Sequence, residues 1–291
     1  MTRTYSNRAW LLLIPALLVM GFVAALPLIA VFNYSFHDIF TLEQAFWIGP
    51  DWYREILSDP RFWGSLGRSA LFSLIVLSVQ VPLGIWLALL MLRMGRLAVP
   101  VLILLALPLV VPWNMIAGMW LTLINPEIGV LGKAMDASGI AFDYKFTALH
   151  TWILIVTVDT WHWLGLVVIL SYAGLSAIPA PYRQAAAIDG ASRLAVFRHI
   201  ELPRIAGALS IVLLLRFVDS FMIYTEAFAI NAGGPQDATT FVSLELGEDI
   251  KSFSYGRAAA RAMLDFLIVL AVAWAFIRIR AGRSGTEGFG A

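Results

Sequence analysis

The sequence has no cysteine and little charge, and each scarcity excludes a class of function. Without cysteine there is no disulfide, no thiolate metal site and no cysteine nucleophile. Charged residues make up only 13% of the 291 residues and the formal net charge is +1, which argues against an electrostatic nucleic-acid binder. None of the four histidines has the spacing of a zinc site such as H-E-x-x-H. These are His37, His150, His162 and His199.

A phosphate-binding P-loop is also missing. That loop needs G-x-x-x-x-G-K-[ST], so that backbone N–H groups and a lysine surround the phosphates. The chain has three lysines, Lys133, Lys145 and Lys251, and none of them stands in this pattern. We therefore expect that the chain binds no cofactor and does not hydrolyse ATP by P-loop chemistry.

Apolar residues are abundant, at 60% of the chain, and the mean hydropathy is +0.82. Lipid is the solvent that explains this composition, because about 20 apolar residues in a helix cross the hydrocarbon layer. Six stretches qualify: Ala9–Phe32, Ser69–Leu92, Leu97–Ile124, Leu149–Leu170, Ile205–Ala229 and Met263–Ile279. The sequence thus predicts an all-α integral membrane protein with about six transmembrane helices.

The boundaries of the membrane domain follow from these stretches. We expect residues 1–8 to be a cytoplasmic N-terminus, 9–281 a single transmembrane domain and 282–291 a disordered tail. A cleavable signal peptide is the alternative for the first stretch. That stretch is longer than a usual signal-peptide core and has no clear A-x-A site, so an uncleaved anchor is favoured.

Basic residues near the span ends orient the chain. With an even number of spans both termini share one side, and that side has eleven basic residues against eight on the other. Arg93 and Arg96, in a short turn between two spans, contribute most clearly to this bias. Both termini and the 173–204 loop are therefore predicted to be cytoplasmic.

The 173–204 loop has the pattern of a helix–turn–helix. Tyr182–Ile188 favours a helix, and Asp189–Gly190 ends it because glycine adopts the left-handed geometry of a helix C-terminus. Ala191–His199 predicts a second short helix, which we expect Leu202–Pro203 to end before the fifth span. The alanine-rich face of the first helix is small enough to lie close against another protein.

This loop resembles the EAA loop of ABC importer permeases, with form E-A-A-x-x-D-G-A, about nine residues, then I-x-L-P. The resemblance covers residues 178–206, and Gln184 stands where the usual motif has glutamate. The matching positions are Ala185, Ala186, Ala187, Asp189, Gly190, Ala191, Phe197, Ile200, Leu202 and Pro203. In that family this loop docks the ATPase, so the resemblance implies the same role for these residues.

Three further stretches resemble the branch of that family that imports sugars, polyols and glycerol phosphate. They are VDTWHW at 158–163, LRFVDSFMIYTEAF at 215–228, and NAGGP at 231–235 followed by TTF. The resemblance implies the type I ABC importer permease fold, as a multi-pass protein of the bacterial inner membrane. It also implies partners: a second permease subunit, two ATP-binding subunits that hold ATP and Mg, and a periplasmic substrate-binding protein.

Polar residues inside the predicted spans are candidates for the substrate path, because ionisable groups are costly in lipid. Asp159 and Asp219 are expected to accept hydrogen bonds from cargo hydroxyls while an indole stacks on the cargo. Alternatively, Arg216 and Asp219 only neutralise each other, since they lie three residues apart on one helix face. Asp265 is expected to be hydrated near the outer end of its span. The full candidate path is Asp159, Trp161, Trp163, Arg216, Asp219 and Tyr224.

Charge in the spans favours a neutral cargo. Arg216 is offset by Asp219, and Asp159 adds a negative charge, which suits a sugar or a small polyol such as glycerol. Glycerol 3-phosphate is the alternative cargo. A secondary transporter and a membrane enzyme without a transport role are the alternative classes, although neither an inverted repeat nor a catalytic constellation is apparent.

Overall fold

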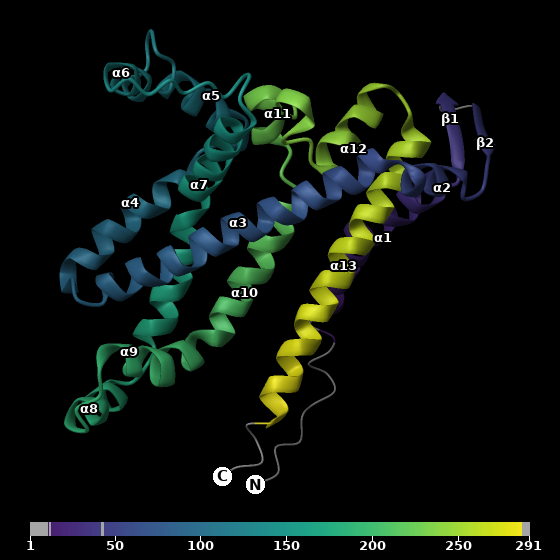
Figure 1. Ribbon diagram of the computed structural model, residues 1–291. Helices are drawn as coiled ribbons and strands as arrows, with labels where there is room; N and C mark the ends of the chain where they lie inside the picture. Colours follow the sequence, from purple (N-terminus) through teal and green to yellow (C-terminus); the bar gives the residue numbers. More distant parts are fainter. Residues whose placement is uncertain (1–10, 12, 42–43, 287–291) are drawn as a thin grey trace. The chain divides into compact units, whose positions relative to one another are not determined.

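The computed structural model describes residues 11, 13–41 and 44–286, and divides into two compact units (Figure 1). Unit 1 comprises Met1–Trp63 and Glu245–Ala275, and unit 2 comprises Gly64–Leu244 and Phe276–Ala291. The predicted cytoplasmic segment 1–8 lies outside the described residues, as do residues 287–291 of the predicted tail.

Five described helices are long and apolar enough to cross a membrane, or six if one bent pair counts as a span. The first, second, third and fifth lie in α1 (Ile14–Tyr34), α3 (Pro60–Met91), α7 (Ala148–Ser176) and α13 (Tyr255–Thr286). The fourth contains α10 (Leu202–Phe221). These helices confirm the predicted all-α membrane fold.

The predicted span Leu97–Ile124 is wrong as a single helix. It consists of α4 (Ala98–Val110) and α5 (Trp113–Leu123), which are bent by 102° relative to each other. Pro112 causes the break, because a proline disfavours helical geometry at the preceding residue and has no N–H to donate. Val111 is accordingly extended, with φ −68° and ψ 127°.

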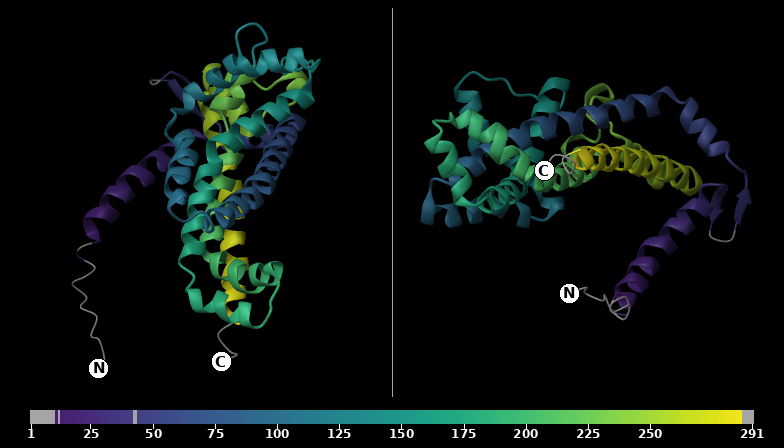
Figure 2. Two further views of the ribbon diagram at one scale, coloured as in Figure 1. Left: turned by 90° about the vertical axis from the view of Figure 1, so that its left-hand side faces the viewer. Right: turned by 90° about the horizontal axis from the view of Figure 1, so that it is seen from below.

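Helix α7 forms the centre of unit 2, where α4 and α10 both pack against it. Figure 2 shows both helices alongside α7 from two further sides. Gly165 permits the contact with α4, since a Cβ there would lie 2.1 Å from the Leu105 carbonyl oxygen. Gly84 of α3 similarly faces Val167 of α7. Small residues thus let helix backbones approach closely, as in other membrane bundles.

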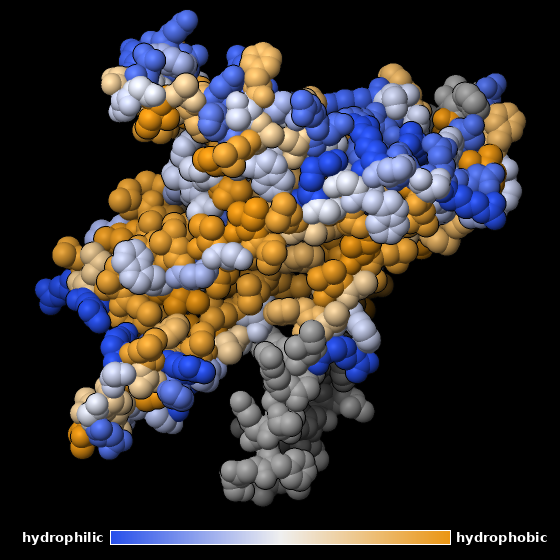
Figure 3. All heavy atoms as spheres, in the orientation of Figure 1, coloured by the Kyte–Doolittle hydropathy of each residue, from blue (hydrophilic) through white to orange (hydrophobic). Residues whose placement is uncertain are grey.

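The outer faces of these helices are apolar. On the face shown in Figure 3, hydrophobic residues gather over α3, α4 and α10. Leu104 of α4 is 65% exposed and Ile211 of α10 is 54% exposed. Exposed large apolar side chains on long helices are expected where lipid is the solvent.

Short helices connect the long ones in unit 2. They are η2 (Gly95–Leu97), α6 (Val130–Ala137), α11 (Thr225–Asn231) and η4 (Pro235–Asp237), together with α8, α9 and η3 described below. Helix α12 (Val242–Lys251) begins at the end of unit 2 and continues into unit 1.

Unit 1 contains a β-hairpin that the hydropathy pattern did not predict. Strands β1 (His37–Thr41) and β2 (Gln44–Trp47) pair antiparallel, with His37 opposite Trp47. Helix α2 (Asp51–Ser58) follows, and Trp52 donates from its indole to the His37 carbonyl at 3.1 Å.

A buried charge cluster joins α12 to α13 in unit 1. Arg261 donates from Nε to Asp249 at 2.7 Å and also pairs with Glu245. Asp265, one turn further along α13, is 1% exposed, and neither of its oxygens accepts a hydrogen bond within the described chain. Asp265 is therefore not exposed to solvent, contrary to the expected position near the outer end of its span, because helix packing covers it.

The predicted disordered tail begins too early. Helix α13 continues through residues 282–286 and ends at Thr286. Once a helix is formed, each added residue contributes a backbone hydrogen bond, so extension past the membrane segment has no nucleation cost.

Candidate functional site

A buried polar network lies between α3, α7 and α10 in unit 2. Arg216 of α10 is 0% exposed and donates from Nη2 to Asp159 of α7 at 2.6 Å. It also donates from Nε to Gln80 of α3 at 3.0 Å, and it pairs with Asp219 one turn along its own helix. Gln80 in turn donates to Asp159 at 2.6 Å. One guanidinium is thus matched by two carboxylates, which keeps it paired inside the membrane.

A small cavity of about 70 Å³ opens beside this network. Trp163 of α7 lies over the Arg216 guanidinium at 4.5 Å, in cation–π geometry. The Asp219 side chain is 27% exposed, whereas that of Asp159 is 5% exposed. Asp219 is therefore the carboxylate with room to accept a further hydrogen bond. The lining comprises Trp113, Asp159, Trp163, Asp219, Met222, Ile223, Tyr224, Thr225 and Glu226.

The structure brings together most of the predicted path residues. Asp159, Trp163, Asp219 and Tyr224 line the cavity, and Arg216 lies directly behind it. Trp161 does not join them. It lies on another face of α7 and packs edge-on against Trp120 at 5.8 Å, because residues two apart on a helix point in different directions.

Gln80 and Trp113 were not predicted, and Glu226, which belongs to the stretch 215–228, was left out of the predicted path although it lines the cavity. Gln80 could have been found, since it is a lone amide inside an apolar stretch. Trp113 could not, because only the unpredicted break before α5 places its ring 6.1 Å from that of Trp163.

The predicted helix–turn–helix is present and forms a second candidate site. Helix α8 (Ala180–Ile188) is followed by Asp189 and then by Gly190, whose φ of +67° is the left-handed geometry expected after a helix. Helix α9 (Arg193–Val196) starts at Ser192, whose hydroxyl accepts from the Ala195 N–H at 3.2 Å. We call residues 180–201 the hairpin.

The expectation that Leu202–Pro203 end the second helix is wrong. The chain passes from α9 through a π-helical turn, η3 (Phe197–Glu201), directly into α10. Pro203 lies in the first turn of α10, where its missing N–H leaves no bond unmade. The hairpin is therefore continuous with the helix that carries Arg216.

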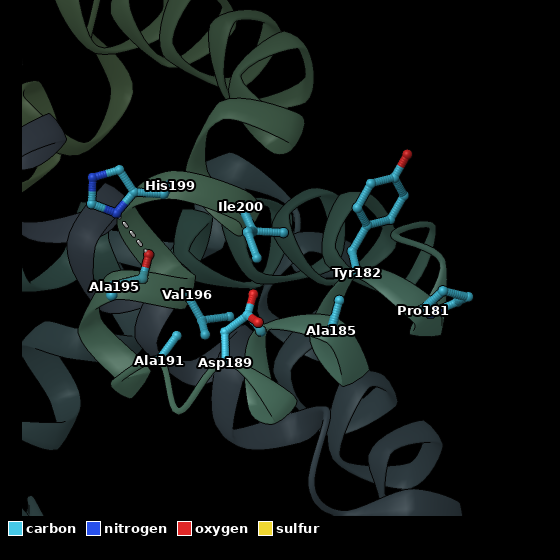
Figure 4. A pocket seen from close by; sticks show the side chains of 10 residues that line it. Pro181, Tyr182, Ala185, Asp189, Ala191, Ala195, Val196, His199 and Ile200 are labelled. Carbon is cyan, nitrogen blue, oxygen red and sulfur yellow. Dashed lines mark hydrogen bonds between the residues drawn. The ribbon is translucent and has the colours of Figure 1, made fainter.

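The hairpin surface has a groove of about 580 Å³ between α8 and α9 (Figure 4). Tyr182, Ala185 and Asp189 from α8 and its end line one side, and His199 and Ile200 line the other. The His199 ring is held by a contact of 3.0 Å between Nδ1 and the Ala195 carbonyl.

The motif residues divide between the surface and the interior of the hairpin. Ala185, Ala187, Gln184 and Asp189 are exposed, whereas Ala186 is only 7% exposed and faces inward. Phe197 and Leu202 pack on a buried cluster formed by residues near the C-terminal ends of α3 and α7 and near the N-terminal end of α10. Two large apolar side chains point outward: Ile188 is 87% exposed and Leu194 is 74% exposed.

Comparison with known proteins places the chain in a family. Residues 80–280 match the family described as "Binding-protein-dependent transport system inner membrane component". The trehalose/maltose transport system permease protein MalF of Thermococcus litoralis is 28% identical over 274 residues, covering 93% of this chain and 92% of the relative. The diacetylchitobiose uptake system permease protein DasB of Streptomyces coelicolor is 27% identical, covering 93% and 85%.

A solved structure has the same fold. A bacterial ABC transporter involved in the import of the acidic polysaccharide alginate contains a chain that superposes with a TM-score of 0.79, at 20% identity, covering 94% of this chain and 96% of that one. The family match favours an ABC importer subunit over the alternatives of a secondary transporter and a membrane enzyme. In this family ATP hydrolysis takes place on partner subunits. The chain therefore belongs to the binding-protein-dependent inner-membrane components, as a permease subunit of an ABC sugar importer.

Proposed function

We propose that the chain forms half of the translocation path for a neutral sugar or polyol, with the cavity at Asp219 as its cargo contact. The observation that carries this proposal is the complete pairing of Arg216 with Asp159 and Asp219. Among the described residues, Arg216 behind the cavity is already paired with two carboxylates, whereas the Asp219 side chain is 27% exposed and can accept a further hydrogen bond.

Charge at the cavity disfavours an anionic cargo. Asp159 and Asp219 line it, against the guanidinium of Arg216. A phosphate would meet net negative charge in a low-dielectric site, where repulsion is strong. Hydroxyl groups of a neutral cargo can instead donate to Asp219, and the flat ring of Trp163 can cover the apolar face of a sugar. Glycerol 3-phosphate is therefore the weaker candidate.

The cavity supports a shared path. Its volume of about 70 Å³ is well below the ~300–1,000 Å³ of ordinary ligand pockets, so one chain supplies only one wall. A second permease subunit would supply the other wall, and a periplasmic binding protein would deliver the cargo. Both termini and the hairpin would face the cytoplasm, where two ATP-binding subunits hold ATP and Mg.

The hairpin is proposed as the docking site for one ATP-binding subunit. Ile188 and Leu194 expose large apolar side chains on a segment whose exposed polar residues include Gln184 and Asp189, and the groove beside Ala185 is open. Exposed apolar residues rimmed by polar ones are typical of protein interfaces. Ala186 would act indirectly, since it faces inward and supports the shape of α8.

Stimulation of ATP hydrolysis tests the cargo proposal. The reconstituted complex with its binding protein is given a panel of neutral mono- and disaccharides, glycerol, and glycerol 3-phosphate. We expect at least one neutral compound to stimulate hydrolysis and glycerol 3-phosphate not to do so. Stimulation by glycerol 3-phosphate alone would refute the neutral-cargo proposal.

A further inference from the structure

A buried carboxylate lies at the base of the hairpin. Glu201, the last residue of η3, is 0% exposed. Its Oε1 accepts from Nε of Arg183 on α8 at 2.9 Å and from Nη1 of Arg193 on α9 at 3.0 Å. Arg183 also donates from Nη2 to the Leu175 carbonyl near the end of α7, at 3.0 Å. One carboxylate and two arginines thus join four helical segments.

This junction connects the hairpin to the membrane cavity. Segments α9, η3 and α10 follow one another without a break, and α10 carries Arg216 and Asp219. By contrast, α8 reaches α9 along the chain only through the turn at Gly190, which is in left-handed geometry. A displacement of α8 therefore reaches α10 through this turn and through the ion pair of Arg183 with Glu201. It also reaches α10 through a cation–π contact, because the Arg204 guanidinium of α10 lies over the Tyr182 ring of α8 at 3.4 Å.

Glu201 is suited to this role, and the other candidate acids and amides in the hairpin are not. The hairpin contains two acidic residues, Asp189 and Glu201, and Asp189 is exposed. Gln184 is exposed and uncharged. The side chains of Arg183 and Arg193 are 29% and 45% exposed, whereas that of Glu201 is 0% exposed. Removing the arginines from Glu201 would therefore leave an uncompensated buried charge, which is costly.

The geometry of the pair also leaves room for movement. Both arginines share Oε1, while Oε2 is buried and accepts no hydrogen bond from any described residue. Either guanidinium can shift to Oε2 without leaving the carboxylate unpaired. A π-helical turn at the same position is consistent with a functional hinge, since such turns occur frequently at functional sites.

We infer that Glu201 is a positioning residue that transmits movement of α8 to α10, so that ATP hydrolysis on a subunit docked at the hairpin changes the membrane cavity. This inference rests on the proposed docking of an ATP-binding subunit at the hairpin. Glu201 is buried and touches neither cargo nor that subunit. It acts by keeping Arg183 of α8 and Arg193 of α9 attached to the residue that precedes α10.

The test compares Glu201→Gln and the milder Arg193→Ala in the complete complex reconstituted in liposomes. Retention of the ATP-binding subunits, ATP hydrolysis and uptake are measured on the same sample. We expect both variants to keep the subunits and to hydrolyse ATP, while uptake per ATP falls about fivefold or more for Glu201→Gln. The double variant should lose no more than Glu201→Gln alone, because the two residues share one interaction. Arg198→Ala, an exposed arginine of the same turn, is the matched control and should behave as the wild type.

Two results would overturn the inference. Unchanged uptake per ATP in Glu201→Gln would show that the carboxylate transmits nothing. Loss of the ATP-binding subunits from both variants would show that it only maintains the docking surface. Failure of the docking proposal itself is recognised separately, because Ile188→Asp would then retain those subunits.

Discussion

Among single residues, Arg216 and Asp219 have different tasks although they pair with each other. Arg216 is fully buried and holds α3, α7 and α10 together through Gln80, Asp159 and Asp219. Asp219 is partly exposed at the cavity, so it can exchange part of its bonding for a cargo hydroxyl. Stability and uptake should therefore respond separately to substitution at these two positions.

Replacing Arg216 by methionine should destabilise the protein. The change leaves Asp159 buried without its cation, at a cost of about 3–5 kcal/mol. Thermal unfolding of the purified protein in detergent should show a clear loss of stability. The double variant Arg216→Met with Asp159→Leu should recover part of it, and a single variant as stable as the wild type would contradict the network's structural role.

Replacing Asp219 by asparagine should lower uptake more than stability. A charge-assisted hydrogen bond to cargo contributes about 1.5–3 kcal/mol, so uptake should fall about tenfold or more. Initial uptake rates at matched protein levels measure this effect. Asp136→Asn on α6, an exposed carboxylate outside the cavity lining, is the control. Equal rates for both variants would remove Asp219 from the path.

Much of this polar site could be predicted, because ionisable residues inside apolar stretches stand out. Asp159, Arg216 and Asp219 were found in this way, and Trp163 and Tyr224 were named as aromatic residues beside them. The spacing of Arg216 and Asp219 predicted that these two residues pair. It could not show that Asp159 and Gln80 also contact the Arg216 guanidinium. Long-range partners depend on helix packing rather than on local sequence.

At the scale of helices, the hairpin shows how proline acts by position. Gly190 ends α8 as predicted, yet Pro203 starts α10 instead of ending the preceding helix. Pro112 does interrupt a predicted span, because it disfavours helical geometry at Val111, the residue that follows α4. Pro108 lies inside α4 and does not end it, so the presence of a proline alone does not predict where a helix breaks.

Docking of the ATP-binding subunit should depend on the exposed apolar residues of α8. Ile188→Asp places a charge where an apolar contact is proposed, so co-purification of that subunit should fall strongly while the permease stays in the membrane. The matched control is Ile188→Val, which keeps the apolar character of the side chain. Normal co-purification of the Ile188→Asp complex would exclude α8 as the docking element.

Close packing of α4 against α7 should depend on Gly165. A Cβ at this position would lie 2.1 Å from the Leu105 carbonyl oxygen, so Gly165→Ala forces the backbones apart. We expect a loss of about 1–3 kcal/mol, seen as a lower unfolding temperature. Gly67→Ala on α3 is the matched control, since nothing lies within 4 Å of a Cβ there. An unchanged Gly165→Ala protein would contradict the close contact.

For the whole molecule, the bent pair α4 and α5 decides the topology. If the pair is one broken span, residue Arg93 and residue Asp136 lie on opposite sides of the membrane. If it is a re-entrant loop, they lie on the same side. We expect reporter fusions at Arg93 to indicate the cytoplasm, and those at Asp136 and Asp249 the periplasm. A cytoplasmic signal at Asp136 would contradict the six-span topology and indicate that the bent pair is a re-entrant loop.

ATP-driven accumulation of a neutral sugar or polyol is the direct test of the proposal that the chain forms half of a translocation path for such a cargo. The complete complex is reconstituted in liposomes with ATP inside and the loaded binding protein outside, and uptake of radiolabelled cargo is followed. We expect accumulation against the concentration gradient that requires both ATP and the binding protein, and we expect Asp219→Asn to reduce it. Accumulation that continues without ATP, or that is unaffected by Asp219→Asn, would contradict the proposal.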